Sequence, residues 1–436
     1  MSKDVVARHW QQRAKALEAT LATTERALLQ RQSQTRKLGR SLHDAQNTRR
    51  DAEAKLAAAE DELAALKVEH YGLRRRAGYV KAAQQNVVCV GDIHGNSTAL
   101  AQLWLRLGEK MGVAELHRTP VVFLGDYCDR GKDTSGVIDW LLTLKRTHGA
   151  PVSFIAGNHD FGMAAFLGCL PISGPPPFDL ESTKNPSFKL HDPKRNQITY
   201  WPHPVEGGMH YLGRRWAQGA VYTARPTMES YGLKMRPGYG EKNTGHDDSF
   251  LPPELRDEFV AAVPAAHKQF LSELQWVHEQ PVDWGHGLSR LICVHSGLDA
   301  SQPVEPQLEA LRRRDLAAAE LYAEADREVR ERVVAFTERE AVWEMPESLR
   351  GTAVLVSGHH GISFAEGDRI ILDRCGGKPE ALGKHPLEAV ILPERTVVGH
   401  DGSVRSLTPK AEPLGVKKDE KDEKARKDEK ARKAKQ

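Results

Sequence analysis

Five short segments combine Asp, His or Asn with glycine, and each directly follows a run of apolar residues. They are Gly91–Gly95 (GDIHG), Gly125–Gly131 (GDYCDRG), Gly157–Asp160 (GNHD), Val294–Leu298 (VHSGL) and Ser357–Gly361 (SGHHG). Carboxylate, imidazole and amide oxygen ligands suit borderline divalent ions, with manganese favoured and iron or zinc as alternatives. Two such ions, roughly 3.5–4 Å apart, can share a hydroxide and bind phosphate oxygens during an in-line displacement. The segments therefore predict a dinuclear metal centre that hydrolyses phosphate esters.

The metal ligands can be assigned within these segments. Asp126 is expected to bridge both ions. The other predicted ligands are Asp92 and His94 on the first ion, and Asn158, His295 and His359 on the second. His360 is the alternative to His359. We favour the histidine that directly follows Gly358, and we expect His360 to lie beside the ligands or to face the substrate.

Other side chains of these segments suit proton transfer and phosphate binding. His159 is not needed as a ligand, so it can protonate the leaving alcohol. Asp129 is the carboxylate expected to orient that imidazole. Arg130 carries a planar guanidinium that suits bidentate contact with phosphate, and Asn158 is expected to contact the substrate as well as a metal ion.

Alternating strand and helix patterns must position the five segments. Strands are predicted at residues 86–90, 120–124, 152–156, 290–294, 352–356, 369–373 and 387–392. Helices are predicted at residues 97–107, 134–144, 160–167, 253–278 and 306–341. The β-α-β-α-β opening favours a parallel sheet with right-handed crossovers. Since ligands bind at the carboxyl ends of strands in such sheets, all five segments are expected at one sheet edge.

The composition restricts the class of protein. The chain has 436 residues, 40% of them hydrophobic, which is enough for about two domains. Its five cysteines are widely spread and never paired as C-x-x-C, which disfavours disulfides and zinc fingers and predicts a cytoplasmic location, with the nucleus as the alternative. A net charge of +3 without a basic-aromatic motif predicts no nucleic-acid partner. No membrane helix or secretory signal is expected.

Two appendages flank the predicted domain of residues 85–395. Residues 1–80 are rich in strong helix formers, and Leu or Ala fills most seam positions of a heptad that starts at Leu21. This pattern predicts a coiled coil, with a solitary charged helix as the alternative. Residues 410–436 contain a charged low-complexity repeat, typical of a disordered tail. Within the domain, an insertion at about residues 170–250 is rich in Pro, Gly, His and aromatic residues. A stretch that long without regular elements is usually a functional loop or a cap.

Deletion of residues 1–80 should turn a dimer into a monomer, because the Leu/Ala seam would lose its partner helix. Hydrolysis of small aryl phosphates should be almost unchanged, since these residues lie outside the five segments. Light scattering and an activity assay measure the two effects. A full-length protein that is already a monomer would exclude a homodimer and leave pairing with a different protein or a helix folded back on the domain.

Over residues 85–395 the sequence resembles the phosphoprotein phosphatases, a calcineurin-like metallophosphoesterase family whose motifs read GDxHG, GDxxDRG, GNHE and HGG. The resemblance implies an α/β fold, the metallophosphoesterase αββα sandwich. It also implies that a phosphoprotein is the substrate and that no covalent intermediate forms. The family's motifs imply the same roles for this chain as those assigned above. These are the metal ligands, Arg130 as the phosphate-binding residue, and Asp129 with His159 as the pair that protonates the leaving group.

Several departures from those motifs resemble the Rhizobiales-like phosphatases of plants and algae. GNHD replaces GNHE, HSG replaces HGG, the last histidine lies in GHHG rather than RAH, and no SAPNY stretch is present. Further similar stretches are residues 213–216 (GRRW), 229–232 (ESYG) and 276–279 (WVHE). The resemblance to this subgroup implies that phosphotyrosine peptides or dually phosphorylated peptides are the substrates. Arg214 and Arg215 form either a second phosphate clamp or a charged loop that packs on Trp216.

Two other functions stay open. A diadenosine-polyphosphate hydrolase uses closely similar loops, and comparing nucleotide polyphosphates with phosphopeptides distinguishes it. A non-catalytic scaffold would act through the coiled coil, but it would tolerate lost ligands, and this sequence retains the full set. We therefore expect a metal-dependent protein phosphatase.

Overall fold

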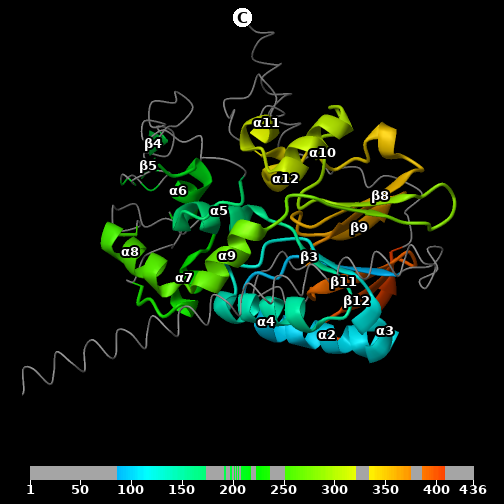
Figure 1. Cartoon of the computed structure of the whole chain (residues 1–436), viewed down its shortest axis with the longest axis horizontal. Helices are drawn as coiled ribbons and strands as arrows, with labels where there is room; N and C mark the ends of the chain where they lie inside the picture. The colour runs from blue at the N-terminus through cyan, green and yellow to red at the C-terminus, as the bar shows by residue number, and fades with distance from the viewer. Residues whose placement is uncertain are drawn as a thin grey trace, which may run out of the picture. The chain divides into compact units, whose positions relative to one another are not determined.

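The computed structural model of the chain describes residues 86–172, 191–192, 197–198, 201, 203, 205, 208–217, 222–235, 251–320, 333–374 and 385–407 (Figure 1). The predicted coiled coil of residues 1–80, the predicted tail of residues 410–436 and much of the insertion lie outside these ranges. Among the helices that are described, none has both the length and the apolar character needed to cross a membrane.

Six strands form the first sheet, in the order β13-β12-β11-β1-β2-β3. They are β1 (Val87–Val90), β2 (Val121–Phe123), β3 (Val152–Phe154), β11 (Glu388–Leu392), β12 (Thr396–Gly399) and β13 (Val404–Ser406). The connecting helices are α2 (Ser97–Met111), α3 (Val113–Arg118) and α4 (Thr134–Thr147). β1, β2 and β3 pair in parallel, whereas β11 runs antiparallel to β1. The predicted parallel opening is confirmed.

Five strands form the second sheet, in the order β6-β7-β8-β10-β9. They are β6 (His278–Pro281), β7 (Arg290–Cys293), β8 (Ala353–Ser357), β9 (Ser363–Glu366) and β10 (Arg369–Leu372). The first three polar segments follow β1, β2 and β3, but the last two follow β7 and β8. The expectation of one sheet edge is therefore wrong. An apolar run predicts a buried strand, but it does not specify which sheet the strand joins.

The apolar core lies on both sides of each sheet. Along β1, Val87 and Cys89 belong to a cluster that also contains Leu291 of β7, so this cluster lies between the two sheets. Val88 and Val90 belong to the other cluster, with residues of the flanking helices. Figure 1 shows α2, α3 and α4 along the first sheet, and α10 (Val304–Arg313) on the side of the second. The layers are therefore helix, sheet, sheet and helix, as the αββα prediction required.

Two long predicted helices are divided in the structure. Pro264 separates α8 (Pro253–Ala262) from α9 (Ala265–Glu273), because proline lacks an N–H and clashes with the preceding turn. Arg314 ends α10 in the left-handed conformation, with φ of 52°. The rest of the second predicted helix contains α11 (Leu316–Glu320) and α12 (Val334–Thr337), while residues 321–332 are not described.

The insertion contributes two short helices beside the site, α6 (Tyr211–Trp216) and α7 (Arg225–Ser230). It also contributes the hairpin β4 (His191–Asp192) and β5 (Gln197–Ile198). α6 lies directly against α5 (Asn158–Leu167), since a Cβ at Gly213 would lie 2.8 Å from the Cβ of Ala165. Glycine permits this close approach of the two helices.

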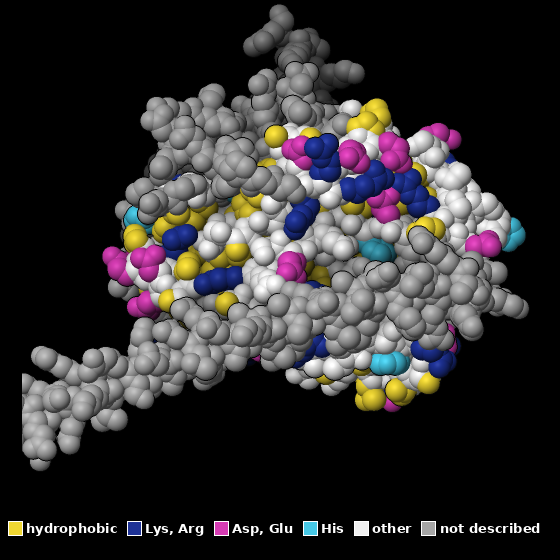
Figure 2. Space-filling model, in the orientation of Figure 1, with side chains coloured by type: hydrophobic (Ala, Val, Ile, Leu, Met, Phe, Trp, Pro, Cys, Tyr) yellow, Lys and Arg dark blue, Asp and Glu magenta, His cyan; other side chains and the backbone are white. Residues whose placement is uncertain are grey.

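Ionic side chains join α10 to the strands that lead to His295. Glu279 of β6 accepts hydrogen bonds from Arg290 of β7 and from Arg312 of α10, the latter at 2.6 Å. Arg290 also donates to Glu305 at 2.8 Å. Figure 2 shows basic and acidic side chains interspersed on the described surface. Since every side chain of this cluster is at least partly exposed to solvent, each pair contributes only about 0–1 kcal/mol.

Candidate metal centre

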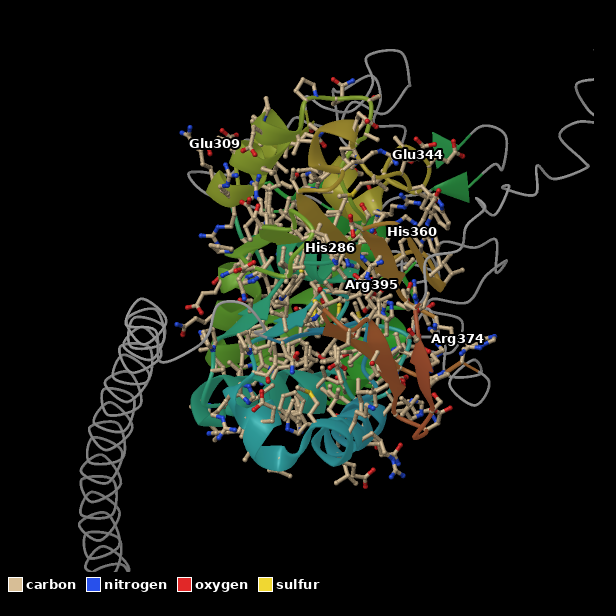
Figure 3. The ribbon with its side chains drawn as sticks, turned by 90° about the vertical axis from the view of Figure 1, so that its right-hand side faces the viewer. His286, Glu309, Glu344, His360, Arg374 and Arg395 are labelled. Carbon is tan, nitrogen blue, oxygen red and sulfur yellow. The ribbon has the colours of Figure 1, made fainter. Side chains whose placement is uncertain are left out.

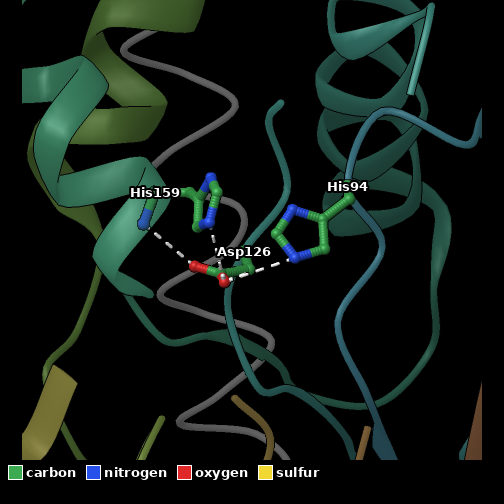
Figure 4. Close-up of side chains that lie close together, drawn as sticks. All are labelled: His94, Asp126 and His159. Carbon is green, nitrogen blue, oxygen red and sulfur yellow. Dashed lines mark hydrogen bonds and ion pairs between the residues drawn. The ribbon is translucent and has the colours of Figure 1, made fainter. Parts of the chain in front are cut away.

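Asp126 lies between histidines that come from three different loops. Its Oδ2 is 3.4 Å from Nε2 of His94, and its Oδ1 is 3.4 Å from Nε2 of His295. Figure 4 shows the carboxylate between His94 and His159, whose Nε2 is 3.9 Å away. Two groups that could hold a metal ion share this carboxylate: His94 with His159, and His295 with His359. Asp126 thus occupies the position predicted for a bridging ligand.

The remaining predicted ligands lie in the same place. Asp92 is 3.8 Å from Nε2 of His94, and its carboxylate accepts a hydrogen bond from the backbone N–H of His359 at 3.2 Å. The Asn158 Oδ1 is 3.2 Å from Nε2 of His295. The structure therefore brings all the predicted ligand side chains together.

His359 and His360 differ in what their imidazoles contact. Nε2 of His360 is 2.8 Å from the backbone carbonyl of Ser296, beside the strands of the second sheet (Figure 3). Nε2 of His359 is buried and has no hydrogen-bond partner among the described residues. A buried imidazole nitrogen left unpaired is costly, and a divalent cation would satisfy it. The donor set thus fits a metal ion, with His359 as the ligand.

At His94, His359 and Asp126, burial and neighbouring charges set protonation states that suit metal binding. Burial lowers the pKa of His94 to about 3. Burial, together with His295, holds the pKa of His359 well below its usual range. Burial alone would raise the pKa of Asp126, but His295, His159 and His94 together hold it well below its usual range. Neutral imidazoles and an ionised carboxylate are the forms that bind a divalent cation.

The backbone of these loops is strained where it turns. Non-glycine residues with positive φ include His94, Asp126, Asp129, Arg130 and His359. Such conformations cost roughly 1–3 kcal/mol each and persist where the surrounding structure holds them. Glycine is needed beside two of the carboxylates. A Cβ at Gly157 would collide with Asp126, and one at Gly358 would collide with Asp92.

His159 and Asp129 form the predicted pair, with Nδ1 of the imidazole 2.7 Å from Oδ2 of the carboxylate. Burial raises the pKa of Asp129, although hydrogen bonds from Thr227 and Trp216 act in the opposite direction. With these two donors and His159, both carboxylate oxygens of Asp129 have hydrogen-bond partners. With Nδ1 occupied, Nε2 of His159 faces Asp126. Because Asp129 does not engage this second ring nitrogen, Nε2 is the one placed to pass a proton to a leaving group.

Arg130 reaches both imidazoles of the first group. Its Nη1 is 2.7 Å from Nε2 of His94, and its Nη2 is 2.9 Å from Nε2 of His159. Both histidines are buried, whereas Arg130 is partly exposed. Its planar guanidinium can therefore meet a phosphate that arrives from solvent.

Arg214 and Arg215 lie side by side on α6 but face different surroundings. Arg214 is buried, and its Nη1 donates to the backbone carbonyls of Trp201 at 3.0 Å and His203 at 2.8 Å. This placement argues against the predicted phosphate clamp at Arg214. Arg215 lies near Tyr222, whose ring packs 4.7 Å from that of His159.

Two carboxylates of the site had no predicted role. The Asp160 carboxylate accepts hydrogen bonds from the backbone N–H groups of Asp126 at 2.7 Å, Tyr127 at 2.8 Å and Gly157 at 2.9 Å, which ties two of the loops together. Its position in the first turn of α5 was the available signal. Asp373 follows β10 directly. After burial, it is the largest influence that raises the pKa of Asp92.

Comparison with known proteins bears on the same region. Residues 86–210 match the model of a family described as calcineurin-like phosphoesterase. The serine/threonine-protein phosphatase BSL2 of Arabidopsis thaliana is 36% identical over 70 residues, which are 16% of this chain and 7% of that relative's length. This match therefore spans only a small part of that protein.

Solved structures resemble a larger share of the chain. One, described as a proposed diadenosine tetraphosphatase, is 16% identical with a TM-score of 0.34, and the alignment covers 75% of this chain and 95% of that one. A cold-active protein-tyrosine phosphatase of a Shewanella species is 13% identical with a TM-score of 0.34, over 74% of this chain and 80% of that one.

Proposed function

We propose that this chain, in which residues 86–210 match the calcineurin-like phosphoesterase family, is a metal-dependent protein phosphatase that hydrolyses phosphate monoesters. The observation that carries the proposal is the Asp126 carboxylate, shared by two histidine groups with Arg130 and the His159–Asp129 pair beside it. Two divalent cations, when bound, would supply an activated water and neutralise phosphate charge. We propose manganese for these ions, with iron or zinc as alternatives.

Different side chains of the site bind the phosphate, contact the substrate and transfer the proton. Arg130 binds and orients the phosphate through its guanidinium, as a fork that matches two phosphate oxygens. Asn158 lies beside His295 and is placed to contact the substrate. Nε2 of His159 is placed to deliver a proton to the leaving oxygen, and Asp129 fixes the ring through Nδ1. The loop backbone, held by glycines and by Asp160, keeps these groups in position.

We propose that the substrate is a phosphoprotein, with phosphotyrosine or dually phosphorylated segments preferred. The 36% identity over 70 residues to BSL2, a serine/threonine-protein phosphatase, supports a protein substrate. Further proposals are a cytoplasmic location and a homodimer or a hetero-partner bound through residues 1–80. No membrane or nucleic-acid partner is proposed.

A substrate panel tests the proposal. Full-length protein with manganese is assayed on peptides that carry phosphoserine, phosphothreonine or phosphotyrosine, and on diadenosine tetraphosphate. We expect release of phosphate from peptides, fastest from phosphotyrosine or dually phosphorylated ones, and loss of activity when a chelator removes the metal. Faster cleavage of the dinucleotide would identify a diadenosine-polyphosphate hydrolase instead. No cleavage of any substrate would favour the scaffold function.

A further inference from the structure

Asp129 receives hydrogen bonds from residues far outside the five segments that carry the predicted ligands. Its carboxylate is fully buried, and its Oδ2 accepts from Nε1 of Trp216 at 2.8 Å as well as from His159. Its Oδ1 accepts from Oγ1 of Thr227 at 2.8 Å. Trp216 ends α6 and Thr227 lies in α7, so both donors belong to the insertion.

The Thr227 hydroxyl contacts both the backbone and the side chain of Asp129. The backbone N–H of Asp129 donates to Oγ1 at 2.8 Å, while the same oxygen is 3.0 Å from Oγ1 of Thr134 in α4. Thr227 is fully buried. The backbone of Asp129 has a φ of 70°, and this contact helps to hold that strained turn.

The indole of Trp216 is fixed by packing against two phenylalanine rings. Its ring lies 5.2 Å from that of Phe166 and 5.8 Å from that of Phe259, and the side chain is fully buried. Its backbone lies close to α5, because a Cβ at Gly162 would be 3.1 Å from the Cβ of Trp216. The indole N–H therefore points at Asp129 with little freedom to turn away.

We infer that Trp216 and Thr227 are positioning residues, which hold Asp129 so that His159 presents Nε2 to the leaving group. The inference rests on the proposed function. The carboxylate of Asp129 can otherwise rotate about its Cβ–Cγ bond. Trp216 fixes Oδ2 and Thr227 fixes Oδ1. Groups behind a functional side chain typically contribute about 10–100-fold, because small errors in orientation are costly in the transition state.

Trp216→Phe and Thr227→Val test this assignment, since each retains most of the shape and removes one donor. With a phosphoserine peptide, kcat should fall about tenfold in each, while KM and metal content stay unchanged. With 4-nitrophenyl phosphate, whose leaving group needs no proton, the loss should be much smaller. Thr227→Ser retains the hydroxyl and should restore the rate.

The chain offers matched controls for both substitutions. Trp201 is also buried, and its indole N–H donates to the carbonyl of Leu251 at 2.6 Å rather than to Asp129. Thr119 is buried, and its hydroxyl donates to the carbonyl of Glu115 at 2.8 Å. Trp201→Phe and Thr119→Val should leave the leaving-group dependence unchanged. Equal losses on both substrates, or equal effects in the controls, would overturn the assignment.

A readout that does not need turnover separates this inference from the proposed function. In full-length protein with ¹⁵N-labelled histidine, the ring resonances of His159 report which nitrogen carries the proton. In wild type, Nδ1 should stay protonated and hydrogen-bonded to Asp129, so that Nε2 is the nitrogen that gains and loses the transferable proton. Trp216→Phe and Thr227→Val should show a shift toward exchange with the tautomer that carries its proton on Nε2 only. Unchanged resonances would overturn the inference. If the wild type is inactive but the two variants still shift the His159 resonances, the phosphatase function is wrong and the positioning role stands.

Discussion

Asp126→Asn should leave the protein without bound metal and with almost no hydrolytic activity. The substitution retains the size of the side chain but removes its charge, and it replaces one oxygen by an NH₂ group that cannot bind a cation. Each carboxylate oxygen faces a different imidazole, so one metal group loses its oxygen ligand and the other retains only a neutral amide oxygen. The fall in kcat should exceed the roughly 10–100-fold that residues behind ligands contribute.

Elemental analysis and kcat measured in parallel test this result. Asp139→Asn is the matched control, because the same change is made at a largely exposed carboxylate that pairs with His267. We expect that control to retain both metal and activity. Two ions retained by Asp126→Asn, with activity near that of wild type, would show that the assigned site is wrong.

His159→Ala should lower the rate by about a hundredfold to ten-thousandfold on substrates with poor leaving groups. The loss should shrink with an activated aryl phosphate, because its leaving group departs without a proton. Bound metal should stay the same, since Nδ1 of His159 is occupied by Asp129 and the role assigned to Nε2 is proton transfer.

The geometry makes metal content the decisive measurement for His159. The side chain lies within reach of the same ion as His94 and Asp126, so a ligand role would show as lost metal. Equal loss on both kinds of substrate would indicate a structural role. His267→Ala is the control, because this buried histidine also contacts a carboxylate, with Nε2 3.0 Å from Asp139, but lies outside the site.

The sequence alone was sufficient to predict that the candidate ligand side chains lie together, and to predict the strands that precede them. Asp92, His94 and Asp126 follow short apolar runs in a β-α-β-α-β order, and parallel strands with crossover helices bring their carboxyl ends together. Glycine beside these residues indicated tight turns. The structure shows that Gly157 and Gly358 also leave room for the carboxylates of Asp126 and Asp92.

Other contacts depended on partners distant in the sequence. Arg214 looked equally suited to phosphate or to a structural role until the carbonyls of Trp201 and His203 were placed beside it. The donors to Asp129, Trp216 and Thr227, lie 87 and 98 residues farther along the chain. No periodicity within the insertion indicates which hydroxyl or indole meets which carboxylate.

The sequence by itself therefore determined which residues are candidates to bind metal, because that depends on side-chain chemistry and on position after a buried strand. Only the tertiary structure decided that His295 and His359 come from a second sheet, opposite the sheet that carries Asp126. The reason is physical. Strands buried on both faces have the same apolar pattern in either sheet, so their pairing is set by how the two sheets and their helices pack together.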